Sequence, residues 1–276
     1  KWAFSECNLL KEVIIPSSVK IIDYSSFSNC SSLKEIKIPS SVNDLDDSVF
    51  HNCTSLAKVY IDAPITSIKD HTFCLCYSLT EINIPSSVTK IGRHAFRECK
   101  SLEEIIIPSS VIKIKRQAFE CCESLIQVIF ELPSSLTLIG SHAFASCKSL
   151  EEIIIPPSVS VVDSHAFISC ESLTEITLPP LITEIGYYIF RKCSSLTEIS
   201  IPSSVTLIDY DAFSECCSLE EITIPSSVKE IKDNAFNECN SLMKITFEEP
   251  SSLTSIGKNA FAGCPLLTNI SIPFSV

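Results

Sequence analysis

Cysteine is the residue type in this chain with the widest chemical range, because a thiolate can form disulfides, ligate metals or act as a nucleophile. The sequence contains 15 cysteines, and twelve of them recur at one position of a repeating pattern, three residues after a phenylalanine, as Cys30 follows Phe27. Copies that recur every 23 residues do not supply the closely spaced pairs of zinc sites. An odd total also cannot pair completely within the chain. The spacing therefore favours a column of buried free thiols that act as small apolar side chains.

Three further cysteines lie outside the repeating position: Cys74, Cys121 and Cys217. Each of them lies within two residues of a cysteine of the column, in Cys-x-Cys or Cys-Cys pairs. We assign these pairs no metal or redox role and expect one or two of the three thiols to be exposed.

Four of the five histidines also share one repeat position, two residues before the phenylalanine: His71, His94, His142 and His165. Two neighbouring imidazoles could bind a metal, but no carboxylate or other third ligand shares this position. A solvated outer face is the preferred interpretation, so we predict no metal site and no cofactor.

The rest of the composition gives no indication of catalysis. There is no Ser/His/Asp arrangement, glycine-rich phosphate loop or paired-carboxylate cleft, and the chain has only five glycines. We therefore predict that the protein is not an enzyme. A formal net charge of −12 argues against nucleic acid and anionic membranes as partners, since both select basic surfaces. No apolar run is long enough to cross a bilayer, and the first residues do not resemble a signal peptide.

The chain as a whole is periodic. A phenylalanine recurs at Phe4, Phe27, Phe50, Phe73, Phe96, Phe119, Phe144, Phe167, Phe190, Phe213, Phe236 and Phe261. All intervals are 23 residues except two of 25. A period in this range is typical of a solenoid, in which each repeat packs only against its neighbours. We therefore predict one array over residues 1–276, of about twelve repeats, that starts and stops inside a repeat.

Each repeat combines a strand pattern with a turn pattern. Residues 35–38 alternate Glu-Ile-Lys-Ile, the period of a strand with one buried face, and Pro39 ends that strand. The following Ala-Phe-x-x-Cys segment is too short for a full helix and suggests one helical or 3₁₀ turn. Parallel stacking of such units predicts a leucine-rich-repeat horseshoe, with a parallel β-sheet on its concave face and short helical or 3₁₀ turns on its convex face.

These residues resemble a known family. The pattern Ile-Pro-Ser-Ser-Val, followed by Ile-x-x-x-Ala-Phe-x-x-Cys-x-Ser-Leu, is similar to the BspA-like leucine-rich repeats of bacteria and anaerobic protists, over essentially all 276 residues. The resemblance implies proteins that are secreted or displayed on the cell surface, some of them adhesins for host cells or extracellular matrix. It supplies no catalytic motif and no specific partner.

The outward strand positions are where a partner would bind. At the position just before the first inward strand residue, eight of the twelve copies are glutamate. Stacked like charges repel, so this column of glutamates costs stability unless cations or a basic partner screen it. Recent duplication of an acidic repeat, together with solubility, explains the column equally well.

Two residues further along the strand, three consecutive repeats place isoleucine outward. A contiguous exposed apolar patch with a charged rim indicates a protein interface. The β-propensity of isoleucine is the alternative explanation, but Thr and Ser occupy the same column elsewhere. The predicted binding site consists of Ile106, Ile126, Ile129 and Ile154, with Glu104, Gln127 and Glu152 as the rim.

These observations predict a non-catalytic protein-binding module, at the cell surface or secreted, which recognises a host or matrix protein through its sheet. An intracellular scaffold that uses the same face on an endogenous partner is the alternative, because free thiols suit a reducing cytosol. Association of exposed array ends into longer assemblies is a third hypothesis.

Overall fold

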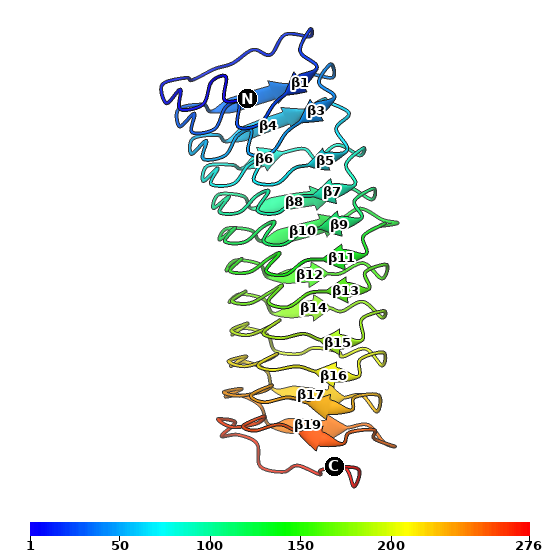
Figure 1. Cartoon of the computed structure of the whole chain (residues 1–276). Coiled ribbons are helices and arrows are strands. Elements are labelled where there is room, and N and C mark those ends of the chain that lie inside the picture. The colour runs from blue at the N-terminus through cyan, green and yellow to red at the C-terminus, as the bar shows by residue number, and fades with distance from the viewer.

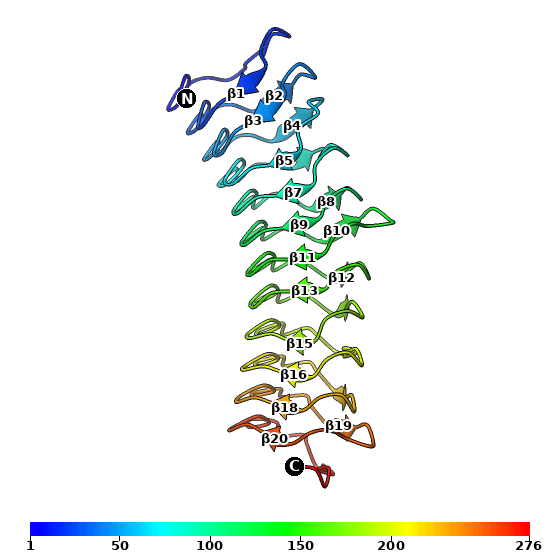
Figure 2. The ribbon, with the colours of Figure 1, turned by 45° about the vertical axis from the view of Figure 1, so that its right-hand side comes forward.

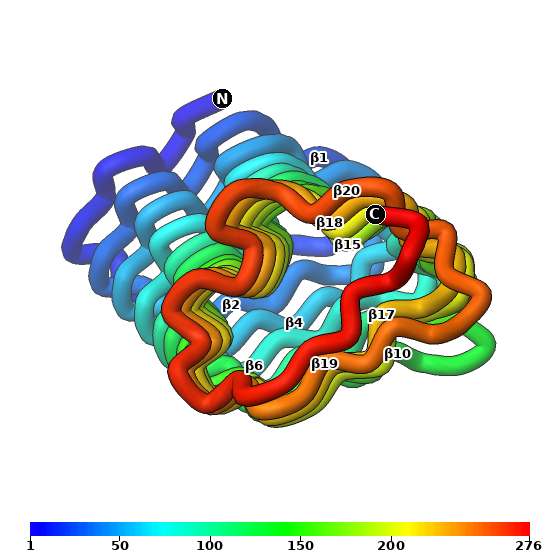
Figure 3. The backbone as a smooth tube through the Cα atoms, turned by 90° about the horizontal axis from the view of Figure 1, so that it is seen from below, coloured from blue at the N-terminus to red at the C-terminus, as the bar shows by residue number.

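The computed structural model describes all 276 residues, which form strands and turns only. Each repeat makes one coil, and the coils stack into an elongated column that bends gently near its N-terminal end (Figure 1 and Figure 2). Seen along the column, successive coils superimpose around a common interior (Figure 3). The predicted repeat solenoid with parallel strands is confirmed. The chain contains no helix that could span a membrane.

One side of the column, here called the long-strand face, carries the predicted strand of each repeat. The strands of this face are β2 (Glu35–Ile38), β4 (Lys58–Ile61), β6 (Glu81–Ile82), β8 (Glu104–Ile107), β10 (Gln127–Phe130), β12 (Glu152–Ile154), β14 (Glu175–Thr177), β17 (Glu221–Ile224) and β19 (Lys244–Phe247). They pair in chain order in three parallel sheets.

A second side of the column carries strands of two residues each, which follow the Pro-Ser-Ser turn. They are β1 (Ile21–Ile22), β3 (Asp44–Leu45), β5 (Ser67–Ile68), β7 (Lys90–Ile91), β9 (Lys113–Ile114), β11 (Leu138–Ile139), β13 (Val161–Val162), β15 (Glu184–Ile185), β16 (Leu207–Ile208), β18 (Glu230–Ile231) and β20 (Ser255–Ile256). The two sets of strands lie on different sides of the coil (Figure 3). The short strands were not expected from the sequence.

Alternation of burial along the strands builds the core. In β2, β8, β17 and β19, exposed and buried residues alternate, as the sequence predicts. The repeating phenylalanines complete the interior. Their rings stack on those of the neighbouring coils, with centroids between 5.0 and 5.9 Å apart, and those from Phe50 to Phe236 have no exposed surface. Each coil thus buries its apolar side chains against the coils on either side.

The structure contradicts the helical or 3₁₀ turns expected for the Ala-Phe-x-x-Cys segment. In every repeat this segment forms non-helical turns. The residues two before and two after each phenylalanine have positive φ, for example His94 at 54° and Glu98 at 59°. The phenylalanine N–H donates to the next coil, as Phe96 N donates to Ala118 O at 2.8 Å. A helix would need those N–H groups within the segment, and it excludes positive φ.

Two insertions lengthen the loops after β10 and β19. The first runs from Glu131 to Pro133 and projects from the column (Figure 1). Both loops contain a cis peptide bond, at Leu132–Pro133 and Glu249–Pro250. The first loop stands beside the predicted binding patch.

Candidate protein-binding face

The predicted patch residues lie together on the long-strand face. Ile106 of β8 pairs in register with Ile129 of β10. Gln127 pairs with Glu152 at the start of β12, which places Ile154 next to Ile129 in the parallel sheet. The structure thus brings three isoleucines from three successive coils into one row.

The isoleucines of the patch differ in exposure. Ile106, Ile126 and Ile154 are 46%, 44% and 60% exposed, whereas Ile129 is half-buried. The central isoleucine is therefore the least exposed of the four.

A groove of about 470 Å³ occupies this region. Its walls include Ile126, Ile129 and Ile154, together with Leu132 of the inserted loop, which is 73% exposed. Leu132 is not part of the site predicted from the sequence, because the insertion interrupts the repeat and gives no indication of where its side chains lie.

The predicted rim forms a single row beside the patch. Gln127 stands in register between Glu104 and Glu152, so a neutral amide separates two carboxylates. Elsewhere in the column, lysines relieve the repulsion: Lys58 Nζ lies 3.1 Å from Glu81 Oε2, and Lys244 Nζ lies 2.9 Å from Glu221 Oε2. Hydrogen bonding to Lys58 lowers the pKa of Glu81.

From β12 onward the column is glutamate in four successive repeats. Glu152 pairs with Glu175, and Glu198 and Glu221 follow in the next two repeats. Glu175, Glu198 and Glu221 line a second groove of about 650 Å³. The outward position two residues further along holds Thr177, Ser200 and Thr223, whose small side chains leave that groove open.

The column cysteines are buried free thiols, as predicted, from Cys30 to Cys239. Each Sγ also contacts a backbone carbonyl of the preceding coil: Cys53 Sγ lies 3.1 Å from Phe27 O, and Cys122 Sγ lies 3.2 Å from Phe96 O. Burial raises the pKa of the Cys170 thiol to about 12. Of the three extra cysteines, Cys121 and Cys217 are half-exposed, and Cys74 is buried. The column is therefore structural.

The histidine position is not the solvated face that the sequence suggested. His71 and His94 stack with ring centroids 4.5 Å apart, and His142 and His165 stack at 4.3 Å. All four are half-buried, and each has positive φ, a backbone conformation that histidine adopts more readily than most residues. Burial lowers the pKa of His94, His142 and His165.

One group of side chains brings three possible metal ligands together. Ligand atoms of His51, His71 and Cys74 all lie within 4.8 Å of one another. His51 and Cys74 each follow a repeat phenylalanine by one residue, whereas His71 precedes one by two. Because the three residues occupy two different repeat positions, the repeat pattern alone does not indicate that they lie close together.

Comparison with known proteins identifies the fold and the family. A family model described as BspA type leucine rich repeat region, of six copies, matches residues 1–126, 66–197, 124–243 and 161–276. No curated protein matches the chain.

Solved structures agree with the family model. A leucine rich cell surface protein from Faecalibacterium prausnitzii is 28% identical, with a TM-score of 0.51 over 91% of this chain and 82% of that one. The leucine rich repeat protein of T. pallidum is 33% identical, with a TM-score of 0.56 over 60% of this chain and 78% of that one. A leucine-rich repeat protein from Eubacterium ventriosum is 19% identical, with a TM-score of 0.51 over 93% and 83%.

The family matches overlap and together extend from residue 1 to residue 276, which are the twelve repeats described above. Leucine-rich repeat proteins are in general non-enzymatic scaffolds that bind other proteins. The coil geometry, the repeat pattern and the family model agree, and the chain belongs to the BspA-type leucine-rich repeat family.

Proposed function

We propose that this chain is a recognition module, displayed at the cell surface or secreted, that binds a protein partner on its long-strand face. The observation that carries the proposal is the apolar groove around Ile126, Ile129 and Ile154. An exposed apolar surface beside polar residues is typical of protein interfaces. The surface location is supported by the family and by the similar structure from Faecalibacterium prausnitzii, which is named a cell surface protein.

The charges around the groove specify the chemistry of the partner. The rim residues Glu104 and Glu152, and the acidic run from Glu175 to Glu221, lie along the same face. A partner with an apolar cluster that fills the groove and with Lys or Arg residues beside it would screen the acidic column. We infer a basic protein surface of the host or matrix rather than an acidic one.

Substitution of Ile154 tests the groove. Ile154→Asp places a charge in the apolar wall and should weaken partner binding at least tenfold, since buried interface anchors contribute about 2 kcal/mol or more. Ile154 is 60% exposed, so the fold should be retained. Binding is measured by surface plasmon resonance against basic host and matrix proteins.

The matched control is Thr246→Asp, at the same position of another coil and outside both grooves. Equal binding by Ile154→Asp and the unmodified chain would exclude the groove as the docking site. Equal loss in both variants would point to a general charge effect instead.

An intracellular scaffold is the second candidate, and the free thiols favour it. All 15 cysteines are unpaired, which suits a reducing compartment. A membrane-impermeant label applied to intact cells separates the two candidates. Labelling without permeabilisation supports surface recognition, and labelling only after permeabilisation supports the scaffold.

A further inference from the structure

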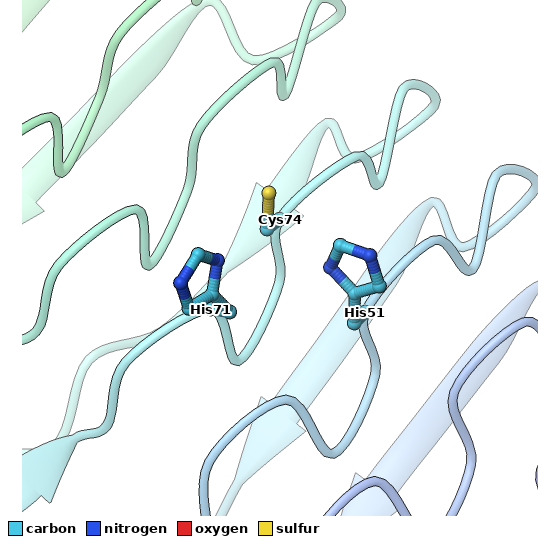
Figure 4. Close-up of side chains that lie close together, drawn as sticks. All are labelled: His51, His71 and Cys74. Atoms are coloured by element: carbon cyan, nitrogen blue, oxygen red, sulfur yellow. The ribbon is translucent and has the colours of Figure 1, made fainter.

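We propose that His51, His71 and Cys74 form a zinc site that links two neighbouring coils on the turn side of the column. His51 belongs to one coil, and His71 and Cys74 belong to the next. Figure 4 shows the two imidazoles side by side, with the Cys74 sulfur above the space between them. The ring centroids of His51 and His71 are 6.2 Å apart, and the ring planes are at 80°.

The donor set is one that zinc prefers. Zinc binds imidazole nitrogen and thiolate sulfur at roughly 2.0–2.3 Å, and tetrahedral ligand atoms at these lengths stand roughly 3.5 Å apart. The three ligand atoms lie within 4.8 Å of one another, so side-chain rotations that move them by about 1 Å are sufficient to close the site. Three protein ligands leave the fourth position for water or another small ligand.

The ligand atoms lack other partners. Nδ1 of His51 is buried and has no hydrogen-bond partner, an arrangement that costs stability unless something else binds the atom. Cys74 is 3% exposed, and only its backbone atoms form hydrogen bonds: its N–H donates to His71 O, and its carbonyl oxygen accepts from Asn52 N. The column cysteines, by contrast, each contact a carbonyl oxygen, as Cys76 Sγ does with Phe50 O at 3.2 Å.

The surrounding charges suit a cation. Arg97, Glu98 and Glu120 are the charged residues that act electrostatically on the Cys74 thiol. Arg97 forms ion pairs with both glutamates, so the three groups together carry one negative charge. His94 stacks on His71, with ring centroids 4.5 Å apart, and brings no additional carboxylate to the site.

Other repeats provide substitutions that fit this fold. Gln117 occupies the same repeat position as His71, with the same positive φ, and the buried Ala145 occupies that of Cys74. His71→Gln and Cys74→Ala should each preserve the coil. His142→Gln is the matched control. His142 and His165 also stack on each other, but neither is followed by a cysteine at the position that corresponds to Cys74.

The test is a zinc titration of the reduced, chelator-treated chain in competition with a chromophoric chelator. We expect one zinc per chain, with affinity reduced at least about 100-fold in His71→Gln and Cys74→Ala, because even outer-shell changes cost up to about that much. Zinc should raise the melting temperature of the unmodified chain and of His142→Gln. Failure of the folded chain to bind zinc, unchanged binding by Cys74→Ala or equal loss in His142→Gln would overturn the proposal.

Cobalt provides a readout that does not depend on the variants. Co²⁺ bound at the site should show thiolate-to-cobalt charge-transfer absorption, with the visible bands of tetrahedral cobalt. Absence of that absorption in the unmodified, folded chain would exclude Cys74 as a ligand.

Discussion

At the scale of single residues, each repeat position has its own physical requirement. The column cysteine is small enough for the interior and also contacts the carbonyl of the preceding coil, as Cys147 Sγ does with Phe119 O at 3.2 Å. The position two before the phenylalanine requires positive φ, which accounts for His142, Asp211 and Asn234 there. The backbone conformation and the available space therefore limit which residue types can occupy these positions.

Thiol reactivity should follow burial in the native chain. The exposed Cys7 and the half-exposed Cys121 and Cys217 should be alkylated by iodoacetamide at neutral pH, because their sulfurs are accessible. The buried Cys122 and Cys147 should be protected, since burial raises their pKa well above the usual value. Mass spectrometry of the digested chain identifies the modified residues.

The same reaction in denaturant is the control, in which all 15 thiols should react. Native Cys122 reacting as fast as its neighbour Cys121 would contradict a buried structural column.

At the scale of elements, the strand and the turn of one repeat differ in how well sequence predicts them. Alternation of Glu, Ile, Lys and Ile determines β2 because only one face of the strand can be buried. The Ala-Phe-x-x-Cys segment has no such periodicity, and its form depends on hydrogen bonds to the next coil, such as Phe73 N to Ala95 O at 2.8 Å. Those partners are 22 residues away, so local sequence suggested a helical turn instead.

Removal of one ring from the phenylalanine stack should be costly. Phe119 is fully buried and stacks on Phe96 and Phe144 at 5.1 and 5.2 Å. Phe119→Ala should lower the free energy of unfolding by about 3–5 kcal/mol, because it removes a large buried side chain and leaves a cavity. The measurement is equilibrium unfolding in urea.

Ile154→Thr is the comparison, since Thr177 occupies the same column in the next coil. Its cost should stay within about 0.5 kcal/mol, as for other surface changes. Similar costs for the two variants would show that the stack is not the principal support of the core.

At the scale of the whole molecule, repetition turns small features into extended surfaces. An outward glutamate in eight of the twelve repeats becomes an acidic column, and the chain as a whole carries a formal charge of −12. One outward isoleucine in three successive repeats becomes an apolar row, and a two-residue insertion adds Leu132 beside it. Both grooves lie on the long-strand face, which is why we assign the partner to that face.

The sequence alone determined the solenoid, the strands of the long-strand face, the phenylalanine and cysteine columns and the row of outward isoleucines. It did so because stacking in parallel register keeps each repeat position beside its own copies. Only the tertiary structure determined which residues at different repeat positions of neighbouring coils are in contact. Cross-coil hydrogen bonds replaced the expected helical turn, and the inserted loop supplied Leu132 to the groove. The approach of His51 to His71 and Cys74 combines three residues from two repeat positions, and only the packing of one coil on the next brings them together.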